Sequence, residues 1–145
     1  MKLYVDSSAL IKAFVPEEGR ESVLELLTRA TGIATSRITY VECRAALSRA
    51  KREGRLQARG ESLAIRNLDD RWPQLQVVEL DELLTKNAGE LTRAHALRAL
   101  DAIHLASADA IVVEAREEVT LACWDRRLWE AAEDSGFSLA PSLSP

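Results

Sequence analysis

The stretch KLYVDSSALIKAF, residues 2–14, passes from a short apolar run to an acid and two serines, and then to a helical pattern. Its apolar part, residues 3–5, predicts a buried strand. Residues 7–14 predict a helix that ends before Pro16, because the residue before a proline avoids helical geometry. Asp6 therefore follows directly after a predicted strand. The type of sheet that this strand joins determines what the Asp6 carboxylate can do.

The alternation of short apolar runs with longer helical patterns continues along the chain. Further strands are predicted at residues 32–36, 75–80, 119–123 and, as an edge strand, 137–141. Helices are predicted at residues 17–31, 37–55, 56–72, 81–97, 101–115 and 125–136. Strands separated by helices need crossover connections, which give a mainly parallel sheet with helices on both faces. We therefore expect an α/β fold, a three-layer α/β/α sandwich.

Length and composition favour one compact domain over residues 1–145. The chain has 145 residues, of which 47% are hydrophobic, and this is enough for a substantial core. The first apolar run is too short for a membrane-spanning helix or a signal peptide, so we expect a cytoplasmic protein with no membrane partner. Cys43 and Cys123 lie far apart and outside any CxxC motif, which indicates neither a disulfide framework nor a zinc site.

Charge is distributed unevenly along the chain. The net charge of −4 argues against a nonspecific nucleic-acid binder. Residues 1–75, however, carry 13 basic and 10 acidic side chains, whereas residues 76–145 carry 6 and 13. The basic excess lies in residues 37–71, which include Arg49 and Arg52. Such a run is usually a solvated helix face, and the alternative is a patch that faces a polyanion.

Four acids occupy places from which they can converge. Asp6 and Asp125 each follow a predicted strand, and ligands of parallel sheets bind outside the carboxyl ends of the strands. Asp101 begins an apolar helix, and Glu42 lies in a helical segment of mostly small and apolar residues. Each aspartate taken alone is explained as a helix cap or first-turn acid. A buried glutamate, by contrast, must be paired, protonated or bound to a cation.

Convergence of these carboxylates predicts a metal site. Like charges in one pocket cost several kcal/mol unless a cation neutralises them. Oxygen ligands without a His or Cys cluster select hard cations, Mg²⁺ or Mn²⁺. Such a site hydrolyses phosphodiesters, and the basic run of residues 37–71 then serves as a flank that holds phosphate.

The sequence resembles a known family at four motifs. YVDSSALIK (4–12), YVECRAAL (40–47), DAIHLASA (101–108) and WDRRL (124–128) are similar, in order and spacing, to PIN-domain ribonucleases, and specifically to VapC-like toxins of toxin–antitoxin pairs. The resemblance covers essentially the whole chain. It implies an endoribonuclease toxin that cuts tRNA or rRNA with Mg²⁺ or Mn²⁺, is inhibited by a VapB-like antitoxin and forms a homodimer.

The resemblance also implies roles for individual residues. It identifies Asp6, Glu42, Asp101 and Asp125 as catalytic, metal-binding acids, and it gives a supporting polar role to Ser8. Two positions need separate comment. Cys123 stands where the family commonly has Thr or Ser, and because a thiol is a weak donor, this leaves open how Asp125 is held. His104 lies one helical turn from Asp101 in an apolar run, and we interpret it as a core histidine outside the site.

Other classes of protein fit less well. An aspartate-nucleophile phosphotransferase would have a second Asp two residues after the first, where this chain has Ser8. A receiver domain would have a lysine late in the fold, and the chain has none after Lys86. A catalytically inactive PIN-like binding module remains as an alternative to the nuclease.

Overall fold

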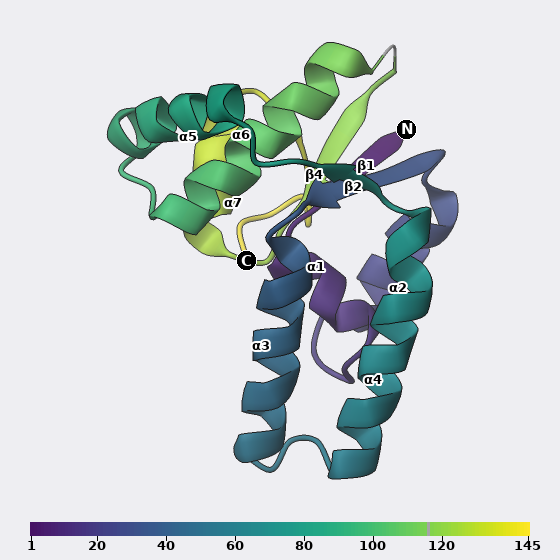
Figure 1. Ribbon diagram of the computed structural model, residues 1–145. Helices are drawn as coiled ribbons and strands as arrows, with labels where there is room; N and C mark the ends of the chain where they lie inside the picture. The colour runs from purple at the N-terminus through teal and green to yellow at the C-terminus, as the bar shows by residue number, and fades with distance from the viewer. Residues whose placement is uncertain (116) are drawn as a thin grey trace.

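A five-stranded parallel sheet forms the centre of the computed structural model, which describes residues 1–115 and 117–145 (Figure 1). The strands are β1 (Lys2–Val5), β2 (Gly32–Ser36), β3 (Gln76–Val78), β4 (Val119–Ala122) and β5 (Ser138–Ala140). They lie in the order β3-β2-β1-β4-β5, with every neighbouring pair parallel. The order reverses between β1 and β4, and such a switch point is where open parallel sheets bind ligands.

Helices cover both faces of the sheet (Figure 1). One layer contains α1 (Ser7–Leu10), the 3₁₀ helix η1 (Ile11–Ala13), α2 (Arg20–Arg29), α3 (Thr39–Arg52) and α4 (Ala58–Arg71), and the 3₁₀ helix η2 (Trp72–Gln74) follows α4. The other layer contains α5 (Glu82–His95), α6 (Ala99–Glu114) and α7 (Arg126–Asp134). Successive strand residues alternate between the two cores, so Leu3 and Val5 pack in one and Tyr4 in the other. The predicted three-layer α/β/α sandwich is confirmed.

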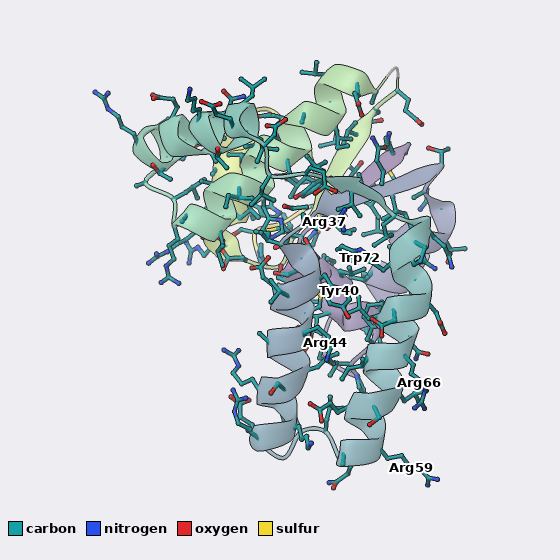
Figure 2. All side chains as sticks on the ribbon, in the orientation of Figure 1. Arg37, Tyr40, Arg44, Arg59, Arg66 and Trp72 are labelled. Atoms are coloured by element: carbon teal, nitrogen blue, oxygen red, sulfur yellow. The ribbon has the colours of Figure 1, made fainter. Side chains whose placement is uncertain are left out.

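Helices α3 and α4 form an antiparallel hairpin that projects beyond the sheet (Figure 1). Cys43 and Leu47 of α3 are fully buried and belong to the same apolar cluster as Leu68 of α4. Near the sheet, the rings of Tyr40 and Trp72 meet edge to face at 5.2 Å, and both side chains lie between the helices (Figure 2). The hairpin carries most of the basic run that the sequence singles out.

Some element boundaries differ from those predicted. The helix expected at residues 7–14 is a short α-helix followed by a 3₁₀ turn, and the next helix starts at Arg20 rather than at residue 17. Gly19, at φ 84°, precedes it, and a Cβ there would lie 2.8 Å from Nε1 of Trp124. Only glycine fits such a left-handed position against a packed indole. Among the helices of the described residues, none has the length and apolarity to cross a membrane.

Candidate active site

Asp6 lies at the exit of β1 and begins α1. Its Oδ1 accepts a hydrogen bond from the Ala9 amide at 2.8 Å, and the Ser8 hydroxyl lies 2.8 and 2.7 Å from the two carboxylate oxygens. The side chain is only 2% exposed. Burial raises the pKa of the Asp6 carboxyl, and the charge of Glu42 adds to this, whereas His104 and the hydrogen bonds lower it. Asp6 is therefore a buried, fixed carboxylate.

Ser8 links Asp6 to the neighbouring strand exit. Its hydroxyl donates to Asp6 and accepts a hydrogen bond from the Trp124 amide at 2.7 Å. The Asp6 amide in turn donates to the Ala122 carbonyl at 3.2 Å. These contacts join the ends of β1 and β4 at the switch point, which fits the supporting role that the sequence predicts for Ser8.

We expect the Ser8→Ala variant to lose about 1–3 kcal/mol of unfolding free energy, because it leaves the Trp124 amide without its acceptor. Denaturant unfolding measures the loss. Ser7→Ala is the matched control, since the Ser7 hydroxyl has no protein partner within the described part of the chain. Equal stability of the two variants would show that the Ser8 bridge contributes nothing.

Glu42 lies in the first turn of α3 and pairs with a histidine. Nε2 of His104 is 2.7 Å from Oε1 of Glu42, and the two side chains are 2% and 21% exposed. The sequence suggested a packed apolar surrounding for Glu42, and this is wrong in part, because Val41 is 63% exposed while Cys43 is fully buried. Glu42 is partly buried rather than buried, and it has a partner in His104.

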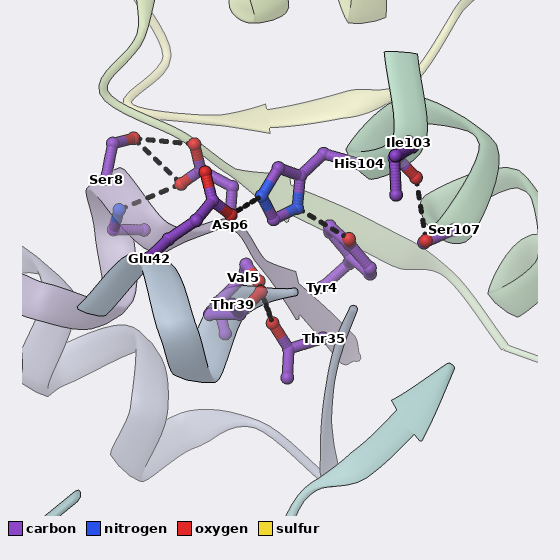
Figure 3. Close-up of polar contacts among 11 residues, drawn as sticks. Tyr4, Val5, Asp6, Ser8, Thr35, Thr39, Glu42, Ile103, His104 and Ser107 are labelled. Carbon is purple, nitrogen blue, oxygen red and sulfur yellow. Dashed lines mark hydrogen bonds and ion pairs between the residues drawn. The ribbon is translucent and has the colours of Figure 1, made fainter. Parts of the chain in front are cut away.

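His104, which the sequence analysis places outside the site, lies beside one of the four acids. It is buried with both ring nitrogens engaged, Nε2 by Glu42 and Nδ1 by the Tyr4 hydroxyl at 2.9 Å (Figure 3). The interpretation as a satisfied core histidine is confirmed, and one of its two partners, Glu42, is a candidate ligand. The available signal was its spacing of three residues from Asp101, which places both on one face of α6.

Asp101 and Asp125 complete the acidic group. Asp101 is partly buried in the first turn of α6, and burial raises the pKa of its carboxyl, as do the charges of Asp125 and Glu42. Asp125 follows β4 and caps α7, where its Oδ1 accepts hydrogen bonds from Arg127 and Leu128 amides at 2.9 and 3.1 Å. The first turn of α6 and the turn after β4 therefore bring these two carboxylates close enough for one charge to act on the other.

Cys123 takes part in holding the Asp125 segment. Its thiol donates to the Asp125 carbonyl at 3.0 Å, so the sulfur fixes the backbone rather than the carboxylate. Burial, with the charge of Asp6, raises the pKa of the Cys123 thiol, which keeps its proton on the sulfur. The substitution of Cys for Thr or Ser thus keeps a donor at this position.

The donor set fits a hard cation. Both nitrogens of His104 are occupied by hydrogen bonds, so the donors left for an ion are carboxylate oxygens, which suit Mg²⁺ or Mn²⁺. As the side chains of the described residues lie, no three His, Cys, Asp or Glu groups form a ready-made ion site. Binding an ion therefore requires side-chain rotation among acids that already act on one another's pKa.

The two arginines predicted to bind RNA lie differently. Arg49 lines a groove of about 270 Å³ that also contains Ser8, Lys12 and Glu42, and its Nε lies 3.6 Å from Oε1 of Glu53, four residues further along the chain. Arg52 is directed to its own helix, with Nη1 donating to the Ser48 hydroxyl at 2.9 Å. The structure brings Arg49 to the site and leaves Arg52 outside it.

Other basic side chains of the run behave as the solvated-face interpretation predicts. Arg37 pairs with Glu79 across the exposed surface, and Arg44 donates to the Tyr40 hydroxyl at 2.9 Å. Arg59 and Arg66 extend outward from α4 (Figure 2). The patch is therefore not uniform, and within the described part of the chain Arg49 and Arg55 of the run line the groove that contains Glu42.

Comparison with known proteins gives consistent results. A family model for the PIN domain matches residues 3–133. Ribonuclease VapC45 of Mycobacterium tuberculosis and ribonuclease VapC49 from another strain of that species are each 38% identical over 140 residues, which cover 97% of this chain and 95% of theirs.

Two solved structures share the fold at low sequence identity. A crystal structure of Mycobacterium tuberculosis VapC20, described as a sarcin-ricin loop cleaving toxin, superposes with a TM-score of 0.68 at 16% identity over 99% of both chains. A chain of a toxin–antitoxin complex from Klebsiella pneumoniae has a TM-score of 0.65 at 16% identity, again over 99% of both chains.

Proposed function

The chain belongs to the PIN-domain family and, within it, to the VapC-like ribonucleases, and from this premise we propose that it is a metal-dependent endoribonuclease toxin. The observation that carries the proposal is the placement of Asp6, buried and hydrogen-bonded at the β1–β4 switch point, within the field of Glu42. Residues 1–145 act in this proposal as a single nuclease domain.

The carboxylates of Asp6, Glu42, Asp101 and Asp125 hold Mg²⁺, or Mn²⁺ in its place. When bound, the cation supplies the positive charge that activates water and stabilises the charge that develops on a phosphodiester. Ser8 keeps the Asp6 carboxylate in one orientation. Asp6 and Asp125 cap α1 and α7, and their capping hydrogen bonds fix the position of each side chain. The chain thereby fixes where two of the four acids stand, and rotation of acidic side chains completes the site when an ion binds.

RNA enters along the groove that Arg49 lines. Lys12, Arg49 and Arg55 line this groove together with Glu17 and Glu42, and their cations now pair with Glu17 and Glu53. A phosphate backbone would compete with these acids for the same cations. The names of the relatives, a ribonuclease and a sarcin-ricin loop cleaving toxin, support RNA as the substrate, and tRNA or rRNA is proposed on the family resemblance. Cleavage of a mixed RNA pool that requires added Mg²⁺ and stops with chelator tests the proposal, and intact RNA under both conditions would refute it.

Replacing Arg49 and Arg52 together by Ala is expected to weaken RNA binding and to flatten its salt dependence. Removing one arginine–phosphate interaction reduces the slope of log affinity against log salt by about 0.7 for a single strand. Because Arg49 lines the groove and Arg52 does not, Arg49→Ala alone accounts for most of the change. RNA titrations at several salt concentrations measure it, with Mn²⁺ affinity unchanged.

The matched control is the pair Arg59→Ala and Arg66→Ala on the neighbouring helix. These side chains extend away from the hairpin, and their removal changes the net charge by the same amount (Figure 2). If both double variants alter the salt dependence of RNA binding equally, the arginine run acts as a general positive surface, and the groove does not contribute more than the rest of it.

A VapB-like antitoxin is the proposed partner, and the proposal places both proteins in the cytoplasm. The toxin–antitoxin complex among the structures of the same fold supports this partner. A homodimer is proposed as well, on the family resemblance. Expression of the chain alone is expected to arrest growth, and coexpression of the antitoxin restores it. Normal growth without antitoxin would contradict the toxin role.

A further inference from the structure

A chain of hydrogen bonds joins three elements that each carry a candidate ligand. The Tyr4 hydroxyl bonds Nδ1 of His104 at 2.9 Å, and Nε2 of His104 bonds Oε1 of Glu42 at 2.7 Å (Figure 3). Tyr4 lies in β1 two residues before Asp6, and His104 lies in α6 three residues after Asp101. The connection therefore runs between the segments that bear Asp6, Glu42 and Asp101.

We propose that His104 is a positioning residue, which holds the Glu42 carboxylate in place for the cation and fixes α3 and α6 relative to β1. This inference rests on the proposed function, because Glu42 is a ligand only in that account. Carboxylates that bind metals are commonly held by such outer hydrogen bonds, and loss of one typically reduces metal affinity or activity about 10–100-fold.

The direction of the bond to Glu42 follows from the groups themselves. An ionised carboxylate only accepts hydrogen bonds, so Nε2 of His104 carries the proton in this contact whether the ring is neutral or charged. One carboxylate oxygen is thereby engaged, and the other is left for a cation. The side chain of Glu42 is 21% exposed and lines the groove.

Packing alone does not account for a histidine here. The ring is 2% exposed in α6, whose other buried residues are all apolar except Ser107. Placing a polar ring in such surroundings costs free energy unless its nitrogens are paired. Both nitrogens are paired, and one of the partners is an acid of the site. Tyr4, fully buried and with a pKa raised mainly by burial, keeps its hydroxyl proton and anchors the other end.

The test compares two replacements of His104, each of which keeps a hydrogen-bond donor at the place of one ring nitrogen. In His104→Gln the amide nitrogen takes the place of Nε2, and in His104→Asn it takes the place of Nδ1. We expect His104→Asn to lower Mn²⁺ affinity and kcat about 10–100-fold while KM for RNA is unchanged, and His104→Gln to recover most of both. Asp109→Asn is the control, because this partly buried carboxyl on the same helix lines a separate groove between α5 and α6.

Wild-type behaviour of His104→Asn, or equal losses in both folded histidine variants, would overturn the inference. If the histidine variants do not fold, Tyr4→Phe decides, since it keeps the ring packing and removes the anchor. A fall in Mn²⁺ affinity in Tyr4→Phe supports the positioning role, and unchanged affinity refutes it.

A spectroscopic measurement separates this inference from the proposed function. The chain has two histidines, so ¹⁵N-histidine spectra of the purified protein resolve His104 once His95 is replaced. We expect a protonated Nε2 whose resonance shifts in Glu42→Gln, and an unprotonated Nε2 would overturn the inference. Wild-type protein that neither binds Mn²⁺ nor cuts RNA refutes the proposed function instead, whatever the spectrum shows.

Discussion

Asp6→Asn is expected to lower metal-dependent RNA cleavage by at least about 100-fold, since the loss of an outer partner alone typically costs 10–100-fold. The amide removes the negative charge from the most buried of the four acids but keeps the oxygen that caps α1. The protein therefore stays folded. Initial cleavage rates at saturating Mg²⁺, with circular dichroism as a check on folding, measure the effect.

Asp81→Asn is the matched control for this variant. Asp81 also follows a strand and caps a helix, with its Oδ1 accepting from the Leu84 amide at 2.8 Å, the distance found for Asp6 and Ala9. It is exposed and stands outside the acidic group. If Asp81→Asn cleaves RNA at the full rate and Asp6→Asn does not cleave it, the effect of Asp6→Asn comes from metal binding and not from helix capping. Comparable activity in both variants would contradict the site.

Asp101→Asn is expected to lower cleavage by a similar factor, at least about 100-fold, and to raise the stability of the fold. Burial and the charge of Asp125 hold the pKa of the Asp101 carboxyl above its usual range, so ionisation is unfavourable in the native state. The amide has no charge to repel Asp125. Thermal unfolding and cleavage rates, measured on the same preparation, test both parts.

The pH dependence of that stability gain has a definite sign. With a raised native pKa, the native state binds more protons than the unfolded chain between the two pKa values, so stability falls as pH rises through this range. The advantage of Asp101→Asn is therefore full above the native pKa and absent below the unfolded value, near 3.9. A gain that grows as the pH is lowered would contradict this explanation.

Asp109→Asn serves as the control for Asp101→Asn. Asp109 lies on the same helix, and burial raises the pKa of its carboxyl too, but it lines a separate groove between α5 and α6. We expect a stability gain from Asp109→Asn without loss of cleavage. Loss of cleavage in Asp109→Asn would mean that the distinction between the two sites is wrong.

Much of the fold follows from local sequence signals. The apolar run before Asp6, the glycines and prolines that end helices and the Asp81 cap define strands and helices close to those observed. Crossover connections then impose a parallel sheet. Boundaries were less predictable where tertiary contacts set them, as at Gly19, whose left-handed conformation lets the Trp124 indole approach closely.

The sequence predicted the individual residues of the candidate site but not the contacts between them. Strand exits indicated Asp6 and Asp125, but the pairing of Glu42 with His104 joins residues 62 positions apart and is visible only after folding. The same holds for Arg49 and Arg52, which are equivalent in the sequence. Helix rotation places Arg49 along the groove and directs Arg52 to Ser48.

Calorimetric titration of Mn²⁺ into the purified, antitoxin-free chain tests the central claim most directly, with the Asp6→Asn, Glu42→Gln, Asp101→Asn and Asp125→Asn variants measured beside it. We predict saturable binding to the wild-type chain and a marked loss of affinity in each folded variant. A wild-type chain that does not bind Mn²⁺, or affinity that all four replacements leave unchanged, would contradict the assignment of these acids to a metal site.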